Sequence, residues 1–562
     1  MMRGARSIAA KVAILGAAIC GAAVAIATPL HAQTASSTFT LWPKWGPFLD
    51  LGGQVGTKRN IGEATLFVPV WQDERAMLFG DFRFKADDQD SHEGNFGLGF
   101  RKMLGEGWNA GLYGFYDHRR TSTANLFNQF TVGAELLGTN FDFRVNTYWP
   151  FGNTQQPVGV ATTGPSTASV SGSTLVVSTP ATMQTYEYAL RGFDAEAGAR
   201  IPITPAQSPY NLRFYAGAYR FDDPTGVAQV VAGPRLRLEF TDYDVQGLWG
   251  GTRFTVSTEW QTDQVRGSQF FAGLRLRVPL QAEPRRSQFT MQERRMTDTI
   301  IRDVDIVANA QTIQIAPAIT ENAVSSGGKT VTAISSATTS GTGLATAVTG
   351  AGGNAYIVLQ GTFNTGTTQI ALSGGQTLMG SGTATFTTTS GRSVTASLPG
   401  ATINSTRTGT TIVQPTDNTT VSGLTINGTG SGGGGLIGIQ PNNTAGNITI
   451  SNNTVTLTQT GANTVNGIGL SANTNVTVSG NTVSVTGIIG QTAQAFIAAA
   501  TSSATVSGNS FSASGGTTNR ATSLTSTTIF SGSTGNVKAA GVCNNGGGNT
   551  GSISFTDGTT CP

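Results

Sequence analysis

Residues that could perform acid–base catalysis are few and widely spaced in the second half of the chain. A polysaccharide lyase needs clustered carboxylates to hold calcium beside a basic residue, and a glycoside hydrolase needs two carboxylates flanking one bond. After Glu321 the acidic residues are Asp417 and Asp557, and the basic residues are Lys329, Arg392, Arg407, Arg520 and Lys538. The histidines, His31, His92 and His118, all lie earlier in the chain. We therefore expect no catalytic residues, no metal site and no cofactor.

Two cysteines, Cys543 and Cys561, lie close together near the C-terminus, and Cys20 lies in an apolar segment near the N-terminus. In an exported protein, the C-terminal pair predicts one disulfide that closes a short loop. The alternative is a pair of free thiols.

Charged residues in the first half alternate with apolar residues. In residues 77–85 one parity carries the charged residues, and the other carries Leu78, Phe82 and Phe84. A period of two marks strands that have one polar face and one apolar face. The residues that we expect on the polar face of such strands are Asp81, Arg83, Lys85, Asp142, Arg144, Arg235, Arg237, Glu239, Arg275 and Arg277.

Two all-β folds have strands of this kind. In a soluble sandwich the charged face would meet water, whereas in an outer-membrane barrel the apolar face meets lipid and the charged face lines the lumen. The barrel is favoured because arginines and carboxylates recur together, aromatic residues gather near the segment ends, and the number of segments is even. We expect twelve strands over residues 47–282, starting near Phe48, Ile61, Met77, Asn95, Trp108, Phe127, Asn140, Thr185, Leu212, Val230, Arg253 and Gln269.

The eighth of these segments fits the alternation worst. Glu187 and Arg191 have one parity, whereas Asp194, Glu196 and Arg200 have the other. Either a bulge or a miscounted strand would account for the mismatch. The connection before this segment, residues 150–184, is long, and we expect it on the outer side of the membrane, where barrel loops are longest.

The first 32 residues predict export. Basic residues precede an apolar run, and the small residues before Gln33 place a cleavage site between Ala32 and Gln33. An uncleaved membrane anchor is the alternative. Charged residues make up 12% of the chain and its net charge is +3. Because typical domains contain about a quarter charged residues, these values disfavour a cytosolic enzyme and a nucleic-acid partner.

Five blocks of the first half resemble the β-domain of inverse autotransporters, the intimin and invasin family. They are residues 78–83 (Leu-Phe-Gly-Asp-Phe-Arg), 95–101 (Asn-Phe-Gly-Leu-Gly-Phe-Arg), 111–117 (Gly-Leu-Tyr-Gly-Phe-Tyr-Asp), 128–136 (Asn-Gln-Phe-Thr-Val-Gly-Ala-Glu-Leu) and 144–150 (Arg-Val-Asn-Thr-Tyr-Trp-Pro). The resemblance extends to about Val307 and implies a twelve-stranded barrel, in agreement with the alternation. In contrast to many members of the family, only a short segment, residues 33–46, precedes the first strand, and we expect it in the periplasm.

The segment after the barrel resembles the linker of this family. Residues 293–298 (Glu-Arg-Arg-Met-Thr-Asp) and 302–307 (Arg-Asp-Val-Asp-Ile-Val) carry both signs of charge. The resemblance implies that a short helix and an extended stretch within residues 283–320 pass back through the lumen. Charges of both signs suit such a lumen because ion pairing offsets the cost of burial. A solvated tether is the alternative.

The second half contains an internal repeat. Residues 447–455 (Asn-Ile-Thr-Ile-Ser-Asn-Asn-Thr-Val) recur as residues 475–483 and, in part, as residues 504–511, so that Asn453, Asn481 and Asn509 are 28 residues apart each time. A fixed period with β-branched alternation predicts a solenoid whose asparagines stack as a ladder. Residues 376–382 resemble the early coils of right-handed parallel β-helix proteins of the pectate-lyase type. A disordered linker rich in Ser, Thr and Gly is the alternative.

Together these features predict an all-β protein, with a twelve-stranded outer-membrane barrel followed by a right-handed parallel β-helix passenger over residues 321–562. The resemblance implies that the barrel contacts outer-membrane lipid, inserts through the barrel-assembly machinery of a Gram-negative cell and exports the passenger to the cell surface. The expected role is adhesion or self-association through an extracellular ligand on a host, a neighbouring cell or a glycan. The alternatives are a channel with an appended β-helix and, less favoured, a surface enzyme that degrades polysaccharides.

Overall fold

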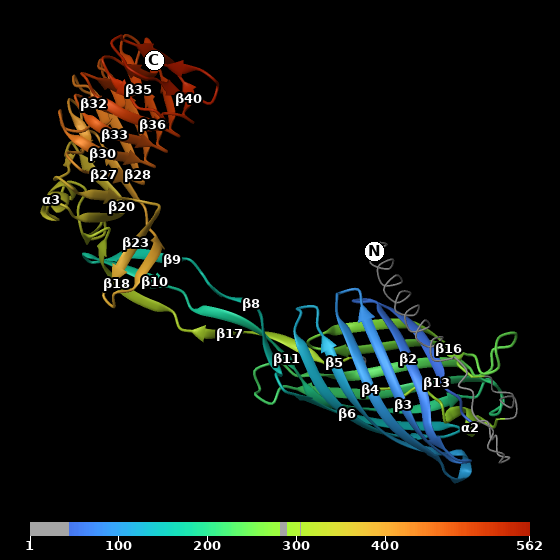
Figure 1. Ribbon diagram of the computed structural model, residues 1–562. Helices are drawn as coiled ribbons and strands as arrows, with labels where there is room; N and C mark the ends of the chain where they lie inside the picture. Colours follow the sequence, from blue (N-terminus) through green and yellow to red (C-terminus); the bar gives the residue numbers. More distant parts are fainter. Residues whose placement is uncertain (1–43, 282–288, 304) are drawn as a thin grey trace, which may run out of the picture. The chain divides into compact units, whose positions relative to one another are not determined.

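A computed structural model describes residues 44–281, 289–303 and 305–562. These residues form two compact units (Figure 1). Unit 1 comprises the described residues up to Ala161 together with Met183–Ile313, and unit 2 comprises Thr162–Thr182 and Gln314–Pro562. Several predictions fall on residues outside this description. They are the signal peptide 1–32 with its cleavage site between Ala32 and Gln33, residues 33–43, and residues 283–288 and 304 of the linker.

Unit 1 contains a closed antiparallel barrel of twelve strands, as the alternation predicts. Phe48 of the first strand pairs with Pro279 of the last, so that the sheet has no free edge. A short 3-10 helix, Gly105–Gly107, lies in one of the turns. The strands are β1 (Phe48–Gly56), β2 (Ile61–Gln72), β3 (Ala76–Asp87), β4 (His92–Met103), β5 (Asn109–Arg120), β6 (Leu126–Leu137), β7 (Phe141–Phe151), β12 (Arg191–Ile201), β13 (Tyr210–Asp222), β14 (Val231–Asp242), β15 (Arg253–Asp263) and β16 (Gly267–Pro279).

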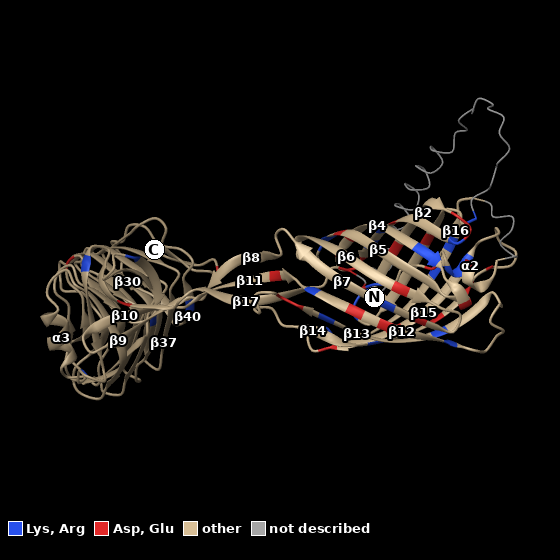
Figure 2. Ribbon diagram, turned by 90° about the horizontal axis from the view of Figure 1, so that it is seen from below, with Lys and Arg blue, Asp and Glu red and all other residues tan. Residues whose placement is uncertain are grey.

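The barrel strands alternate between an apolar outer face and a polar inner face. On β4, for example, Phe96 and Leu98 are exposed, whereas Asn95 and Arg101 are buried. Most of the acidic and basic residues on the barrel strands are buried, which places them on the inner face. Figure 2 marks the positions of these residues along the strands in blue and red. This is the arrangement of a barrel whose outer wall meets lipid.

Glycines on the inner face make room for aromatic rings from the neighbouring strand. A Cβ atom at Gly97 would lie 2.3 Å from the ring of Phe115, and one at Gly99 would lie 2.3 Å from the ring of Phe79. A third ring, that of Tyr113, covers Gly133 in the same way. The alternation of glycine with apolar residues in 95–101 therefore has a packing cause, because only glycine leaves space for the ring.

The eighth barrel strand begins at Arg191 and not near Thr185, so the predicted boundary is wrong. The predicted segment contains two separate strands, β11 (Thr182–Ala189) and β12, which belong to different sheets. β11 lies between β8 (Gln155–Thr163) and β17 (Ala308–Ala316) in a three-stranded sheet outside the barrel. The change of parity between Glu187 and Asp194 marks this change of sheet, and no bulge is needed to explain it.

Unit 2 is built almost wholly of short strands, with one helix, α3 (Leu344–Gly350). Two of its strands, β9 (Ser166–Ser171) and β10 (Thr174–Thr179), form a hairpin. In sequence this hairpin lies between two barrel strands, but it pairs with strands of unit 2. The strands that follow the barrel are β18 (Ile319–Ser326), β19 (Lys329–Ser335), β20 (Tyr356–Gly366), β21 (Ile370–Ala371), β22 (Thr377–Met379), β23 (Thr383–Thr388), β24 (Ser393–Ser397), β25 (Ala401–Ser405), β26 (Thr411–Gln414), β27 (Thr420–Ser422), β28 (Leu424–Gly430), β29 (Leu436–Ile439), β30 (Gly446–Ser451), β31 (Thr454–Gln459), β32 (Val465–Ser471), β33 (Thr474–Ser479), β34 (Thr482–Thr486), β35 (Thr492–Ala499), β36 (Ser503–Ser507), β37 (Ser510–Ser514), β38 (Thr518–Leu524), β39 (Thr528–Ile529), β40 (Val537–Ala540), β41 (Val542–Asn545), β42 (Ile553–Ser554) and β43 (Thr560–Cys561).

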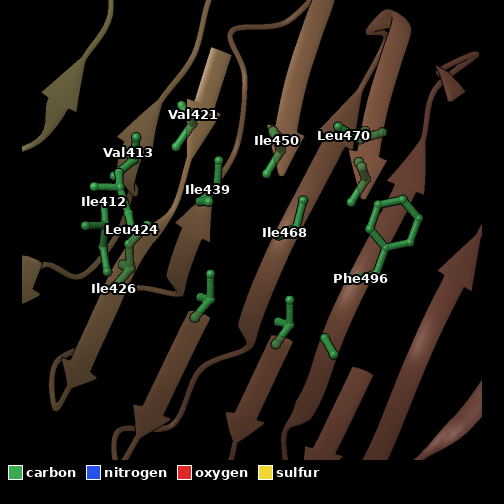
Figure 3. Close-up of a cluster of buried hydrophobic side chains, with 14 of the residues drawn as sticks. Ile412, Val413, Val421, Leu424, Ile426, Ile439, Ile450, Ile468, Leu470 and Phe496 are labelled. Carbon is green, nitrogen blue, oxygen red and sulfur yellow. The ribbon is translucent and has the colours of Figure 1, made fainter. Parts of the chain in front are cut away.

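Most strands of unit 2 pair in parallel with the equivalent strand of the next repeat. Ile448 on β30 lies beside Val476 on β33, which lies beside Ala504 on β36. The same relation joins β31 to β34 and β37, and β32 to β35 and β38. Their inward side chains form one continuous apolar core, part of which is drawn in Figure 3, with Ile450 and Phe496 fully buried. Burial of each such side chain contributes about 1.5–3 kcal/mol.

None of the helices in the described part of the chain is both long and apolar enough to cross a membrane.

Candidate functional site

The described residues between Phe289 and Val307 lie inside the barrel. They start with helix α2 (Met291–Arg295), which has a capping box between Thr290 and Glu293. The capping box forms because the threonine side chain and the glutamate satisfy each other's backbone N–H groups. Polar contacts reach this segment from strands on every side of the closed barrel, and it therefore occupies the lumen.

Asp142 on β7 holds the C-terminal end of helix α2. Arg295 donates from Nη1 to Oδ1 at 2.6 Å and from Nη2 to Oδ2 at 2.9 Å. Arg213 Nη1 also donates to Oδ2 at 3.0 Å, and the Tyr215 hydroxyl donates to Oδ2 at 3.1 Å. All four side chains are buried. Two arginines around one carboxylate give this end of the lumen an anchor that is both charged and geometrically specific.

The next turn of the segment is held from three more strands. Arg253 on β15 donates to Asp298 Oδ1 at 2.9 Å. Arg101 on β4 donates to the Asp298 carbonyl at 2.6 Å. Arg277 on β16 donates to the Thr297 carbonyl at 2.8 Å while it makes a bidentate pair with Asp50, at 2.8 Å for both bonds. Barrel arginines thus satisfy backbone carbonyls that have no helical partner.

Further along, the segment supplies charges of both signs to the barrel wall. Arg302 forms a bidentate pair with Asp117 on β5, with N–O distances of 2.8 and 2.7 Å. Asp303 accepts from Arg235 on β14 at 2.8 Å. Arg302 and Asp303 are both buried, and each has a charged partner within hydrogen-bond distance, which offsets the loss of its hydration.

The last charged residue of the segment, Asp305, lies between two arginines. Arg59 Nη1 is 2.6 Å from its Oδ2 and Arg119 Nη2 is 2.9 Å from the same atom. The backbone N–H of Ile306 donates to Glu93 Oε2 at 2.7 Å. The segment is therefore fixed along its described length and not only at its helix.

The segment leaves a cavity of about 80 Å³ beside it within the lumen. Glu63, Lys85, Glu259 and Arg275 are among its lining residues. A polar space of this size holds water molecules but no solute of the size of a sugar. The arrangement can hold a chain segment in place and obstruct the lumen.

The structure places the residues predicted for the polar face as follows. All lie on the inner side of the wall, and all but Glu239 and Arg275 are buried. Asp81 pairs with Arg83 at 2.7 Å, and Arg275 lies 3.4 Å from Glu63. Arg144 and Arg237 both reach Glu196 at 2.7 Å, and Arg237 also pairs with Glu239 at 2.6 Å. Asp142, Arg235 and Arg277 contact the segment or its partners, as described above.

Several residues that hold the segment were missed from the sequence. They are Asp50, Glu93, Arg101, Asp117 and Arg253, together with Arg213, which holds Asp142. A signal was available for Arg101 and Asp117, because both lie within blocks that resemble the family and both share the parity of buried residues on their strands.

In unit 2 the asparagines of the repeat form a buried ladder. Asn453 Nδ2 donates to Asn481 Oδ1 at 3.0 Å, and Asn481 Nδ2 donates to Asn509 Oδ1 at 2.9 Å. Asn509 Nδ2 continues the ladder to Asn536 Oδ1 at 3.0 Å. At the other end Leu424, which has no amide side chain, gives only its backbone N–H to Asn453 Oδ1 at 3.0 Å. The ladder satisfies buried backbone groups in every layer that it crosses.

The C-terminal cysteines and the charged residues of unit 2 have local partners. Cys543 and Cys561 are joined by a disulfide. Arg392 pairs with Glu321 at 3.0 Å, and Lys538 lies 3.5 Å from Asp557. Asp417 accepts from the backbone N–H of Gly446 at 2.8 Å. Within the described ranges, no three His, Cys, Asp or Glu side chains are grouped so that they could hold a metal ion.

Comparisons with solved structures find membrane proteins at low similarity, among them an outer membrane channel and a porin. A membrane protein from work on the mechanism of in-meso crystallization has 14% identity, a TM-score of 0.34, and coverage of 48% of this chain and 100% of its own. The COG4313 outer membrane channel from Pseudomonas putida F1 has 11% identity, a TM-score of 0.31, and coverage of 44% and 99%. The NanC porin has 9% identity, a TM-score of 0.25, and coverage of 41% and 100%.

No curated protein matches the chain. A family model does match part of it, and the matched region takes in strands β1 to β7 and β12 of the closed barrel. The blocks that resemble the family in sequence all fall within this region. Residues 34–213 match the model of the inverse autotransporter β-domain, which indicates a barrel of the outer-membrane kind.

Proposed function

We propose that this chain is an outer-membrane surface protein whose barrel anchors and exports its C-terminal region as a passenger. The observation that carries the proposal is the segment ending near Val307, which is fixed inside a closed barrel by ion pairs such as Arg295–Asp142 and Arg302–Asp117. A chain that enters the lumen after its last barrel strand and is followed by a folded unit suits an export path. Insertion by the barrel-assembly machinery, with lipid around the apolar wall, belongs to the same proposal.

The passenger, in this proposal, is a right-handed parallel β-helix over residues 321–562. Support comes from the parallel pairing of each strand with its equivalent one repeat later, and from the asparagine ladder through Asn453, Asn481 and Asn509. A single core shared by all layers also suits a solenoid, because each repeat alone cannot bury its apolar face.

Adhesion or self-association is the role that we propose for the passenger. The outer faces of β31 and β34 present rows of hydroxyl groups, from Thr454 and Thr456 on one strand and Thr482 and Ser484 on the next. These rows carry no charge, so they suit a hydrogen-bonding surface such as a glycan or a second passenger. A host cell, a neighbouring cell or a glycan would supply the ligand.

An open channel is less well supported, because the lumen holds the segment and a cavity of only about 80 Å³. A polysaccharide-degrading enzyme is less well supported still, because the charged residues of unit 2 pair locally and leave no carboxylate pair facing a common space.

Protease treatment of intact cells tests the proposal. An epitope tag is inserted between Ile489 and Gly490, in a turn where Ile489 is 88% exposed. Surface display predicts that the tag is lost from intact cells while the barrel remains resistant. A tag that is cleaved only after the outer membrane has been opened would contradict export. Loss of cell binding on deletion of residues 321–562, with the barrel still inserted, tests adhesion separately.

A further inference from the structure

The hairpin β9–β10 is part of unit 2, although the chain on both sides of it belongs to unit 1. Its turn is tight, with Ser171 paired to Thr174. In sequence it lies between barrel strands β7 and β12. The last five barrel strands and the lumen segment separate it from the remainder of unit 2. A connection between two barrel strands thus provides two strands of the other unit.

Backbone pairing joins the hairpin to two strands of unit 2. β10 pairs antiparallel with β18, the first strand of unit 2 after the lumen segment, with Ser178 opposite Thr320 and Val176 opposite Asn322. β9 pairs in parallel with β24, with Ser166 opposite Ala396. β18 would otherwise present this edge unpaired, and an unpaired edge is open to pairing with another chain.

Side chains of the hairpin complete a separate apolar core at this end of unit 2. Leu175 and Val177 are 1% and 2% exposed, and they pack in one cluster with Val358 and Phe386, both fully buried. Ala168 of β9 belongs to the same cluster. Without the hairpin, one side of this apolar cluster would be exposed to solvent.

Two further hydrogen bonds fix the hairpin in register. The backbone N–H of Val170 donates to Gln360 Oε1 at 2.6 Å, and the backbone N–H of Ala333 donates to the Ser173 carbonyl at 3.3 Å. The hairpin is therefore docked by backbone pairing on two edges, by burial of its apolar face and by a specific side-chain contact.

We propose that the hairpin β9–β10 is the template on which unit 2 begins to fold. β18 pairs with the edge of β10, which lies between two barrel strands in sequence and is therefore made before β18. β19 and β20 then add in sequence order. The strands from β25 to β41 each pair with a strand made one repeat earlier, so a partner from elsewhere in the chain is needed in the first layers. The hairpin supplies that partner, which lowers the entropic cost of forming the first layer. This inference rests on the proposed passenger role of unit 2, but its test requires no export.

The contact is tested with a cysteine pair in the full chain. Ser178→Cys with Thr320→Cys joins residues whose hydroxyl oxygens are 3.2 Å apart, and a disulfide is expected after oxidation. The matched control is Thr174→Cys with Thr320→Cys, in which the first position lies four residues earlier in β10, beside the turn of the hairpin. No cross-link in the first pair, or equal cross-linking in both, would overturn the docking.

The template role is tested by refolding the urea-unfolded full chain in detergent micelles and following the protease resistance of unit 2. Val177→Ala is expected to slow the appearance of resistance by about tenfold, with little change in the rate at which resistance is lost, because template contacts form before the transition state. Val483→Ala, at a buried position in the middle of the stack, is the control and is expected to act mainly on unfolding.

Val177→Asp and Val160→Asp extend the comparison. The first places a charge in the apolar cluster, whereas Val160 is 83% exposed in β8. The template predicts that Val177→Asp alone abolishes or strongly delays protease resistance of unit 2 while the barrel still folds. If Val177→Ala changed only the unfolding rate, the hairpin would be a passive cover and the template role would be wrong. A tag on the wrong side of the membrane, in contrast, would overturn only the export proposal.

Discussion

Arg295 and Asp142 form a two-bond ion pair inside the barrel, at 2.6 and 2.9 Å, between helix α2 and strand β7. Both side chains are buried, so neither can regain water if the other is removed. The pair thus fixes the helix end of the lumen segment, in addition to the contacts that hold the rest of it.

Replacing Arg295 with alanine is expected to loosen the lumen segment and open a conducting path. Loss of one partner from a buried pair costs about 3–5 kcal/mol. Single-channel recordings in planar bilayers should show frequent openings that the wild type lacks, and the barrel should unfold at a lower temperature on gels. The control is Arg191→Ala, because that arginine pairs with Asp222 at an exposed position, where such a pair contributes about 0–1 kcal/mol. Equal conductance in both variants would contradict the assigned role of Arg295.

Gly97→Ala is expected to destabilise the barrel, because the added Cβ would lie 2.3 Å from the Phe115 ring. Overpacking of this kind costs about 1–3 kcal/mol. The measurement is the temperature at which the folded barrel loses its faster mobility on a gel. Gly105→Ala is the matched substitution, since its Cβ would have no atom within 4 Å. The packing argument fails if the two variants unfold at the same temperature.

Asn481→Ala is expected to weaken unit 2 more than Asn427→Ala. The first substitution removes the bonds that Asn481 makes to Asn453, to Asn509 and to the Ile450 carbonyl, and it leaves buried groups unpaired at about 1–3 kcal/mol each. Asn427 belongs to a partly buried ladder with Asn404 and can turn to water. The urea midpoint for protease resistance of unit 2 in the full chain measures the difference. Similar midpoints would show that the buried ladder is not a special source of stability.

Replacing Cys543 and Cys561 together with serine is expected to release the last strands. The disulfide spans 18 residues, and closure of a loop of about that length contributes about 3 kcal/mol by restricting the unfolded chain. Hydrogen exchange should become faster in β41, β42 and β43 while β30 and β33 keep their protection. Uniformly faster exchange across unit 2 would instead mean that the disulfide supports the whole stack.

The barrel could be predicted from its sequence because its inner and outer faces differ in chemistry at every second residue. The predicted starts at Phe48, Ile61 and Arg253 coincide with those of β1, β2 and β15. The failure near Thr185 has a physical cause, because β11 and β12 are adjacent in sequence but belong to different sheets. Local alternation records which face is buried, and it does not record which partner buries it.

The same limit explains what was missed around the lumen. The sequence indicates that Asp142 and Arg144 share a face, but only the closed barrel places Asp142 beside Arg213 and Arg295. The hairpin β9–β10 was hidden for a related reason. Leu175 and Val177 are buried by residues more than a hundred positions later in the sequence, such as Phe386. The sequence of the loop alone does not indicate which residues these are.

The constant register of the layers between β30 and β38 makes the length of unit 2 adjustable in whole layers. Excision of residues 454–481 would place Thr482 directly after Asn453 and would bring Ile448 beside Ala504, in the register that each now has with Val476. Duplication of the same 28-residue block would add a layer and lengthen the stack by about 4.8 Å, the spacing between strands. Recombination between repeats in the gene can therefore vary the reach of this protein in small steps without a new fold.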